Sequence, residues 1–305
     1  MQVTRVRLQN YRNISFTDLP FAGLTQMMVG RNAQGKTNLL EALGLLSALR
    51  SFRTADVSTL IRQGQSEARL IFNLQDERFG DTEVSLILRR KGKEVEVDGE
   101  KVVRFRDFIG RFPVVVLSSQ DIQLLRGSPG VRRQWLNLVL SSADRSYYDC
   151  LRDYHKLLLE RNSLLKSRAA KSEMAVFEKM LAEQAVLLFQ KRAEGVEALR
   201  THLVSVYNVI APKEEQPELA YKPDIEIDSA ERFLHALDKN RERDAILKAT
   251  QQGPHRDELL IRLQGRGARD FASEGQQRSM IISLKIAQLW YEHQALRILP
   301  VLLAD

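Results

Sequence analysis

The sequence predicts an α/β protein that is interrupted by a long helical insertion. Three observations support this prediction. A glycine-rich phosphate-binding motif stands between an apolar run and a helical segment near the N-terminus. Short apolar runs typical of buried strands occur toward both ends of the chain. Between Tyr147 and Ile210 there is no proline, and leucines and charges are spaced as in long amphipathic helices.

The composition excludes several classes of protein. The 305 residues carry 46 Lys+Arg against 39 Asp+Glu, a formal net charge of +7, and 44% of them are hydrophobic. No apolar run approaches the roughly 20 residues of a membrane span, and charges occupy the place where a signal peptide would need apolar residues. The single cysteine, Cys150, cannot form an internal disulfide. We therefore expect a cytoplasmic protein with no membrane partner, whose basic charge permits binding to nucleic acid.

The first part of the chain, residues 1–120, predicts several strands and one helix. Apolar residues that alternate or run continuously predict strands over residues 2–8, 25–29, 69–74, 82–90, 94–97, 101–103 and 113–117. Asp98-Gly99 lies between two of these runs and predicts a hairpin turn, because glycine tolerates positive φ. The run rich in leucine from Asn38 to Leu49 predicts a helix.

The helical insertion follows over residues 121–245. Its proline-free part predicts a hairpin of two helices that turns near Ser167–Ser172. Residues 246–305 return to the α/β pattern, with a strand at 258–263, a helix at 273–293 and a strand at 299–304. The outline is an α/β body built from both ends of the chain, with a helical arm between them.

The phosphate-binding motif reads Gly30-Arg-Asn-Ala-Gln-Gly35-Lys36-Thr37. Its glycines let consecutive backbone N–H groups approach phosphate oxygens. Lys36 is expected to reach the β- and γ-phosphates, and Thr37 to supply a hydroxyl to Mg²⁺. The motif therefore predicts a nucleotide site whose contacting residues are Gly30, Arg31, Asn32, Gly35, Lys36, Thr37 and Asn38.

Such a site also needs an aspartate at the end of a buried strand, where the carboxylate orients Mg²⁺ and its waters. The strand at 113–117 ends in Ser118-Ser119-Gln120 and offers no acid at its tip. The strand at 299–304 is followed by Asp305, which is the better candidate. The alternative is an ordinary core strand that happens to end in aspartate. Asp305 is therefore the expected second magnesium ligand and, with Lys36, a catalytic residue.

A second anion site is predicted where a helix begins at Ser273. Ser273 and Gln276 have the spacing of a capping box, which alone would explain both residues. Gly275 in the first turn lowers helix stability by about 1 kcal/mol relative to alanine, so it predicts close approach of another group to the backbone. A bare helix N-terminus attracts anions. Its position is similar to the signature motif of ABC-type ATPases, in which this helix end contacts the γ-phosphate held by the opposite subunit.

Further motifs are distributed over nearly the whole chain: Leu8-Gln-Asn-Tyr-Arg-Asn13, Val29-Gly-Arg-Asn-Ala-Gln-Gly-Lys-Thr-Asn-Leu-Leu-Glu-Ala42, Ser51-Phe-Arg-Thr54, Gly127-Ser-Pro-Gly-Val-Arg-Arg133, Gly253-Pro-His-Arg-Asp257 and Ser273-Glu-Gly-Gln-Gln277. Together they resemble the RecF family of bacterial recombinational-repair ATPases, which is related to SMC and ABC-type proteins. Generic ABC ATPases lack the motifs at Gly127–Arg133 and Gly253–Asp257. The family usually has proline and an acid where this chain has Ser119 and Gln120. Gln120 is either a magnesium-sensing glutamine or an exposed loop residue. His255 and Arg256 receive no predicted role beyond a capped turn before a strand.

The resemblance implies an ABC-type (SMC-like) P-loop ATPase head with an inserted α-helical arm, in which residues 1–120 and 246–305 form the ATPase lobe. It implies ATP and Mg²⁺ as cofactors, weak ATP hydrolysis in the intact family, and a homodimer formed on ATP. In that dimer, Ser273, Gly275 and Gln276 of one chain complete the site of the other. It further implies binding to double-stranded DNA near single-strand gaps, with RecR, RecO and RecA as partners in gap repair and the SOS response.

Four arginines are candidates for contact with DNA. Arg126, Arg132 and Arg133 form a cluster without an acid, and phosphate-backbone binding needs such unpaired cations. The arm adds further cations, because residues 145–172 carry seven Lys/Arg against three Asp/Glu. For these cations a solvated helical face is the alternative to contact with DNA. Arg53 resembles the arginine that couples DNA to ATP in SMC-type heads, or it pairs with a local acid such as Asp56. We expect no base-specific readout, because no recognition-helix or zinc-ligand pattern is present.

The sequence ends at Asp305, and the family's water-positioning acid and γ-phosphate-sensing histidine follow this aspartate. We therefore expect a C-terminally truncated chain that binds ATP and hydrolyses it poorly or not at all. Three other classes remain as alternatives. A transporter's nucleotide-binding subunit would have a much shorter spacing between Thr37 and Ser273. An SMC-type chromosome protein would need far longer heptad segments, and a small-molecule kinase would place its magnesium acid earlier.

Overall fold

The computed structural model describes residues 1–76, 78 and 80–305 and divides the chain into two compact units. Unit 1 comprises Met1–Gln120 together with Glu292–Asp305, and unit 2 comprises Asp121–Tyr291. Residues 246–291, which the sequence assigned to the ATPase lobe, thus lie in unit 2. The physical reason is strand pairing, because the strand that begins at Glu258 pairs with a strand of the arm segment.

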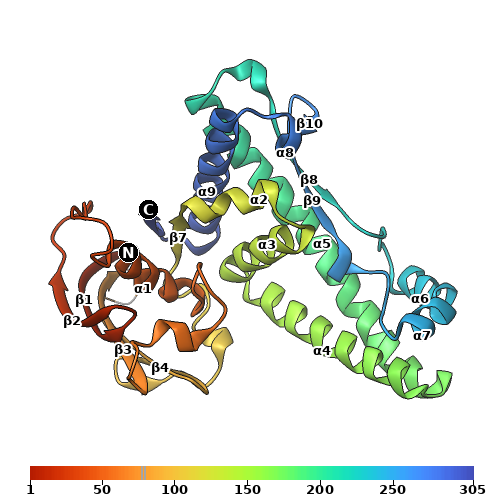
Figure 1. Ribbon diagram of the computed structural model, residues 1–305. Coiled ribbons are helices and arrows are strands. Elements are labelled where there is room, and N and C mark those ends of the chain that lie inside the picture. Colours follow the sequence, from red (N-terminus) through yellow and green to blue (C-terminus); the bar gives the residue numbers. More distant parts are fainter. Residues whose placement is uncertain (77, 79) are drawn as a thin grey trace. The chain divides into compact units, whose positions relative to one another are not determined.

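Unit 1 contains a six-stranded antiparallel sheet with the order β2-β1-β3-β4-β5-β6. Strands β1 to β4 are labelled in Figure 1. Its strands are β1 Gln2–Tyr11, β2 Ile14–Pro20, β3 Glu67–Asp76, β4 Gly80–Arg89, β5 Gly92–Val97 and β6 Glu100–Lys101. Alternate residues such as Leu70 and Phe72 are fully buried, which gives the sheet one core face. The predicted turn at Asp98-Gly99 joins β5 to β6, and both residues have positive φ.

Helix α1 (Lys36–Ala48) contributes its buried residues to the same core, and Ala42 and Leu45 are fully buried. A second, two-stranded sheet belongs to unit 1. It pairs β7 (Val114–Leu117) with β11 (Val301–Ala304) in parallel, so segments that are far apart in the sequence lie side by side. The 3-10 helices of unit 1 are η1 Val57–Leu60, η2 Phe105–Asp107 and, across its boundary, η3 Ser119–Ile122.

The strand predicted at Thr25–Val29 is wrong for the described residues, because residues 25–30 have no regular secondary structure. Met27 and Val29 are exposed by 86% and 87%. A strand requires a hydrogen-bonded neighbour, and β7 pairs only with β11 among the strands that the structure describes. The apolar run before Gly30 therefore lacks the pairing that its composition led us to expect.

Unit 2 is built around a helical hairpin, as predicted. Helix α4 spans Arg145–Ser167 and α5 spans Lys171–Ile210, so the second arm of the hairpin is much the longer. Gly195 lies on α5 against α3 (Pro129–Ala143), and a Cβ at this position would collide with the side chain of Leu140. Close packing of the two helices therefore requires glycine here.

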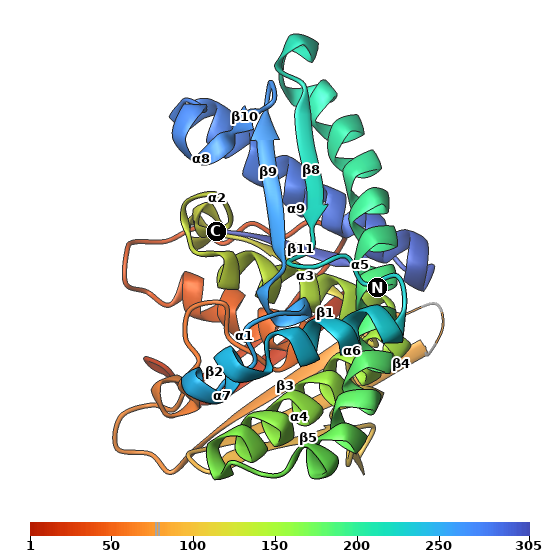
Figure 2. The same ribbon diagram turned by 90° about the vertical axis from the view of Figure 1, so that its right-hand side faces the viewer.

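A three-stranded antiparallel sheet, β10-β9-β8, packs beside α5 (Figure 2). Its strands are β8 Pro217–Lys222, β9 Glu258–Leu263 and β10 Arg266–Gly267. The remaining elements of unit 2 are α2 Gln123–Arg126, η4 Lys213–Glu215, α6 Ala230–Lys239, α7 Arg241–Leu247, η5 Pro254–Arg256 and α8 Ala268–Phe271. Helix α9 (Glu274–Leu296) begins in unit 2 and ends in unit 1. Among the helices of the described residues, none combines the length and apolar character that crossing a bilayer requires.

Candidate functional site

The phosphate-binding motif forms an exposed turn that leads directly into helix α1, which begins at Lys36. Gly35 caps the helix with φ 95°, and Ala33 also lies in the left-handed region with φ 64°. A Cβ at Gly35 would approach Asn13 Oδ1 to 3.3 Å, so both the backbone conformation and the space favour glycine. Because the first N–H groups of a helix have no partner within it, the start of α1 can receive a phosphate.

Lys36 lies across this turn. Its Nζ atom donates to the carbonyl oxygens of Gly30 at 2.6 Å and Arg31 at 2.7 Å, while Arg31 and Asn32 are exposed. The ammonium is thus held at the loop by neutral acceptors. A phosphate carries full negative charge and offers this ammonium stronger, charge-assisted hydrogen bonds.

Thr37 and Asp305 meet at this site from opposite ends of the sequence. Thr37 Oγ1 donates to Asp305 Oδ1 at 2.8 Å, across a separation of 268 residues. The parallel pairing of β7 with β11 produces this contact, because it places Ala304 opposite Leu117 and Asp305 N donates to Leu117 O at 2.9 Å. Parallel strands end at the same edge of a sheet, so the carboxylate emerges beside the start of α1.

Gln120 lies just beyond the same edge, exposed within η3. The carboxyl end of β7 therefore presents this glutamine on the unit that carries the phosphate-binding turn. The position is compatible with both roles weighed from the sequence, the magnesium-sensing glutamine and the exposed loop residue.

The Thr37–Asp305 pair suits Mg²⁺, because a hydroxyl and a carboxylate supply the oxygen ligands that this hard cation prefers. Among the described residues, no group of three or more His, Cys, Asp or Glu side chains is arranged to hold a metal. A magnesium ion at this pair would therefore take its other ligands from phosphate oxygens and water, as Mg²⁺ commonly does.

A buried carboxylate lies beneath the turn and was not predicted. Glu41 on α1 is fully buried. It accepts two hydrogen bonds from Arg12 at 2.8 and 2.6 Å, one from Ser51 Oγ at 2.5 Å and one from Arg53 at 3.3 Å. Burial raises its pKa, but the bonds from Arg12 and Ser51 and the charges of both arginines outweigh this, so the pKa lies below its ordinary value.

Asparagine side chains connect this carboxylate cluster to the turn. Arg53 also donates to Asn38 Oδ1 at 2.8 Å, Asn38 Nδ2 donates to Asn13 Oδ1 at 2.7 Å, and Asn13 Nδ2 donates to Ala33 O at 3.2 Å. Arg53 thus pairs with a local acid, which is Glu41, whereas Asp56 caps η1 through Ser58 N. The motifs quoted from the sequence contain these residues, but only their contacts reveal that they form one network.

The predicted second anion site is the start of helix α9, in unit 2. The capping box is present, since Gln276 N donates to Ser273 Oγ at 3.2 Å and Ser273 N donates to Gln276 Oε1 at 2.9 Å. Ser273 and Gly275 are exposed, and a Cβ at Gly275 would find only Ser273 Oγ, at 4.0 Å. Nothing within the described chain requires glycine here, so the space above this helix end is open to another molecule.

The three arginines of the predicted DNA-binding cluster differ in their surroundings. Arg132 donates two hydrogen bonds to the carboxylate of Glu258, at 2.8 and 2.9 Å, and its side chain is only 14% exposed. Arg133 donates to Asp257 O at 2.8 Å, and burial lowers its pKa. Arg126 is exposed and donates to Gln277 Oε1 at 2.8 Å. Arg126 is therefore the most accessible of the three.

The motif Gly253–Asp257 forms a buried junction in unit 2. Asp257 Oδ2 accepts from Arg192 at 2.6 Å and from Tyr221 at 2.5 Å, and both Arg192 and Asp257 are buried. His255 is bonded through Nδ1 to Tyr154 Oη at 2.7 Å and through Nε2 to Thr250 O at 3.0 Å. The motif thus fixes the entry into β9 against the arm helices. The sequence indicated a turn before a strand here, which η5 and β9 form, but it did not indicate these buried contacts.

Comparison with known proteins relates the whole chain to one family. A family profile described as "AAA domain, putative AbiEii toxin, Type IV TA system" matches residues 27–279. The "DNA replication and repair protein RecF" of Geotalea daltonii is 34% identical over 312 residues, covering 100% of this chain and 85% of the relative. The RecF of Bacillus cytotoxicus is 31% identical, covering 100% of this chain and 84% of the relative.

Solved structures support the same relationship. The fold is similar to that of the recombination mediator protein RecF-ATP in the RecFOR pathway, with a TM-score of 0.94, 28% identity, and coverage of 99% of this chain and 84% of that chain. An Smc head domain from Pyrococcus furiosus has a TM-score of 0.53 at 13% identity, covering 99% of this chain and 89% of that chain, which is a likeness of fold alone. The predicted P-loop ATPase fold with inserted helices is confirmed.

Proposed function

The chain belongs to the RecF family of DNA replication and repair proteins, and we propose that it acts in recombinational repair as an ATP-gated DNA-binding protein. Its ATP site is the turn at Gly30–Thr37, with Lys36 on the β- and γ-phosphates. The observation that carries this proposal is the hydrogen bond between Thr37 and Asp305. Two residues 268 positions apart meet at the mouth of a phosphate-binding turn, where a nucleotide-bound Mg²⁺ needs a hydroxyl and a carboxylate.

Thr37 and Asp305 would hold the magnesium ion, which would neutralise charge on the β- and γ-phosphates when bound. Lys36 exchanges its two carbonyl acceptors for phosphate oxygens. Arg31 and Asn32 line the exposed side of the turn, and Asn38 fixes the opposite side through Asn13. Gln120 is a candidate magnesium-sensing residue at the edge of β7.

We propose that the site is completed by a second copy of the chain. The exposed, glycine-containing start of α9 is a helix N-terminus of the kind that binds phosphate. Ser273, Gly275 and Gln276 of one protomer would contact the γ-phosphate held by Lys36 of its partner. Nucleotide is then shared between protomers, which makes dimerisation depend on ATP.

Double-stranded DNA near single-strand gaps is the proposed ligand of the dimer. Exposed cations of α4 and of the residue that caps its C-terminus support this part of the proposal. Within the described residues, no ion pair is formed by Arg145, Lys156, Lys166 or the cap residue Arg168. Arg126 adds an accessible cation beside α3, whereas Arg132 and Arg133 would act mainly by holding the α3–β9 junction. Arg53 would couple DNA binding to nucleotide through Asn38 and Glu41. RecR, RecO and RecA are the proposed partner proteins.

The decisive test of the shared site uses two variants, Lys36→Met and Ser273→Arg. Each variant alone is expected to remain monomeric with ATP, because every composite site then carries one defect. An equal mixture is expected to recover dimers, because one of the two sites in a mixed dimer is intact. Light scattering after gel filtration, with and without ATP and Mg²⁺, measures the outcome. Dimers of either single variant at wild-type levels would contradict the shared site.

A further inference from the structure

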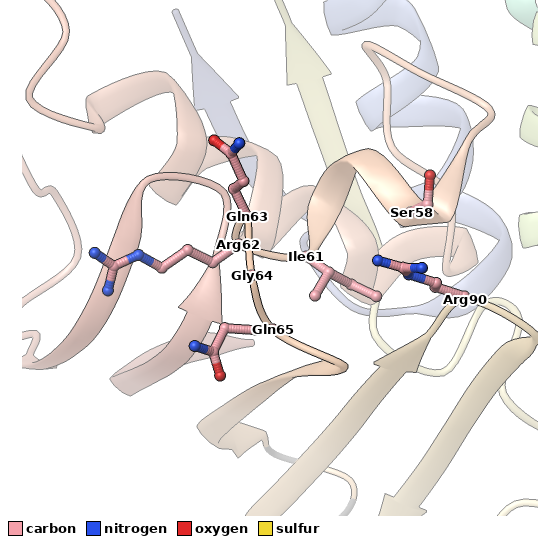
Figure 3. A pocket seen from close by; sticks show the side chains of 7 residues that line it. All are labelled: Ser58, Ile61, Arg62, Gln63, Gly64, Gln65 and Arg90. Atoms are coloured by element: carbon pink, nitrogen blue, oxygen red, sulfur yellow. The ribbon is translucent and has the colours of Figure 1, made fainter.

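A basic surface lies on unit 1 where two turns meet, and no role has been assigned to it. A shallow pocket of about 290 Å³ is lined by Arg62, Gln63 and Gln65 from the turn before β3, and by Arg90 from the turn after β4 (Figure 3). A second hollow beside it adds Lys91. We call these five residues the basic turn surface. None of them belongs to the phosphate-binding motif or to the arm.

The first turn is held firmly in place. Gln65 N donates to Arg62 O at 3.0 Å, and Gly64 supplies the positive φ of 84° that the turn requires. The preceding residue, Ile61, is buried and bridges to Tyr11 of β1. Arg62 N donates to Asn10 O of the same strand at 2.8 Å. The side chains of Arg62 and Gln65 therefore project from a fixed backbone.

The second turn is the hairpin between β4 and β5. Arg89 pairs with Gly92 in the register, so Arg90 and Lys91 form the two-residue turn itself. Hairpin turns of this length favour glycine, asparagine and aspartate, so two adjacent cations are not explained by turn formation. Sheet pairing does not need them either, because they lie outside the strands.

The nearby acids are already occupied. Glu67 and Glu94 both accept hydrogen bonds from Arg89, and Glu94 also pairs with Lys101. Within the residues that the structure describes, Arg62, Arg90 and Lys91 form no ion pair, and Arg90 and Lys91 are exposed. The basic turn surface is thus an uncompensated group of positive charges with amide side chains between them.

The directions of the two arginines indicate the kind of ligand. Figure 3 shows Arg90 reaching toward Ile61, whereas Arg62 extends to the other side of the turn. Two guanidinium groups that diverge cannot both grip one small anion, but they can contact successive phosphates of a polymer. The lining holds no aromatic side chain on which an unpaired base could stack.

We propose that the basic turn surface binds the phosphate backbone of double-stranded DNA, as a contact on the ATPase unit separate from the nucleotide site. Arg62, Arg90 and Lys91 contact phosphates, and Gln63 and Gln65 donate neutral hydrogen bonds to the backbone. This inference rests on the proposed DNA-binding function and adds the site. Because the contacts are to phosphates alone, binding here is independent of base sequence.

The test measures fluorescence anisotropy of a labelled duplex at several salt concentrations, with ATP and Mg²⁺ present. It compares the wild-type chain with a triple variant, Arg62→Ala, Arg90→Ala and Lys91→Ala. Each lost phosphate contact makes the slope of log K against log salt shallower by about 0.9. We expect the triple variant to lose one to three contacts, a change of about 0.9 to 2.7 in slope. ATP binding, measured in the same samples, should stay at the wild-type level.

The matched control removes three exposed cations of unit 2, with Lys222→Ala, Lys239→Ala and Arg243→Ala. The control variant has the same net charge as the test variant. If the slope of log K against log salt became equally shallow in both, overall charge alone would explain the effect, and the proposal would be overturned. An unchanged slope in the test variant alone would overturn it while leaving the proposed function intact. If the wild-type chain binds no duplex, the proposed DNA-binding function and the proposed contact at the basic turn surface are both contradicted. Competition by millimolar inorganic phosphate at constant ionic strength would instead assign the surface to a small anion and overturn the DNA contact.

Discussion

Arg12 and Glu41 form a bidentate ion pair beneath the phosphate-binding turn, with N–O distances of 2.8 and 2.6 Å. Glu41 is fully buried, and the side chain of Arg12 is 18% exposed. The pair joins the turn between β1 and β2 to helix α1. Through Asn38 and Asn13 the same cluster reaches Ala33 of the loop. The shape of the phosphate-binding turn therefore depends on a carboxylate that is buried beneath it.

We expect Glu41→Gln to lower the free energy of unfolding of unit 1 by about 3 kcal/mol, because it leaves Arg12 without its counter-charge in a poorly hydrated position. Urea denaturation measures the loss. The matched control is Glu83→Gln, which removes the partner of Arg7 in an ion pair whose acid is 45% exposed, and should cost less than about 1 kcal/mol. If the two substitutions lowered the free energy of unfolding equally, the buried pair would contribute no more to stability than the exposed pair.

Asp305→Asn and Thr37→Val are expected to weaken ATP binding only when Mg²⁺ is present. Either change removes an oxygen ligand of Mg²⁺ or its charge. Affinity for ATP with Mg²⁺ should therefore fall about tenfold or more, at least as much as when a side chain that only supports a metal ligand is changed. Affinity in EDTA should match the wild-type value. Isothermal titration calorimetry in both buffers checks this, and an equal loss in EDTA would indicate damage to the turn rather than to a metal site.

The stability of unit 2 should depend on pH through His255. Burial lowers the pKa of this imidazole to about 4 from an ordinary value of 6.5. Since Thr250 O can only accept, Nε2 carries the proton and Nδ1 accepts from Tyr154. The unfolded chain binds a proton more tightly than the folded chain does. His255 therefore contributes stability that is fully present above about pH 6.5 and is lost as the pH falls toward 4.

His255→Asn is expected to flatten the rise of unfolding free energy between pH 4 and 6.5 by up to about 1.4 kcal/mol per pH unit. The control His235→Asn changes an exposed histidine and should keep the wild-type slope. His155 contributes in the same direction, because burial and the charge of Arg192 also lower its pKa, so some slope should persist. The measurement is chemical denaturation at several pH values, and an unaltered slope for His255→Asn would contradict the assignment.

Gly195→Ala should destabilise unit 2 by about 1–3 kcal/mol, although alanine is the better helix former. The added methyl group collides with Leu140 of α3. Thermal unfolding measures the loss, and Gly267→Ala, where a Cβ meets open space, is the control. In the double variant Gly195→Ala with Leu140→Val the two losses should not add, because the smaller side chain relieves the collision.

Local chemistry made several features predictable. The turn at Asp98-Gly99, the capping box of Ser273 and Gln276, and the helical hairpin each depend on residues close together in sequence. The exposed run at Thr25–Val29 shows the limit of such patterns. Its apolar composition suits a strand, but a strand forms only where a neighbouring strand is available to pair with it. The residues of the run do not determine whether such a neighbour exists.

The amino-acid sequence by itself determined the family, the phosphate-binding turn and the candidate residues Lys36, Thr37 and Asp305, because motif spacing constrains backbone and charge locally. Only the tertiary structure decided which distant groups share a site. Parallel pairing of β7 with β11 brings Asp305 to Thr37, and burial gathers Arg12 and Arg53 around Glu41. Burial and partner choice arise when separate segments pack together and exclude water, and that depends on all of them at once.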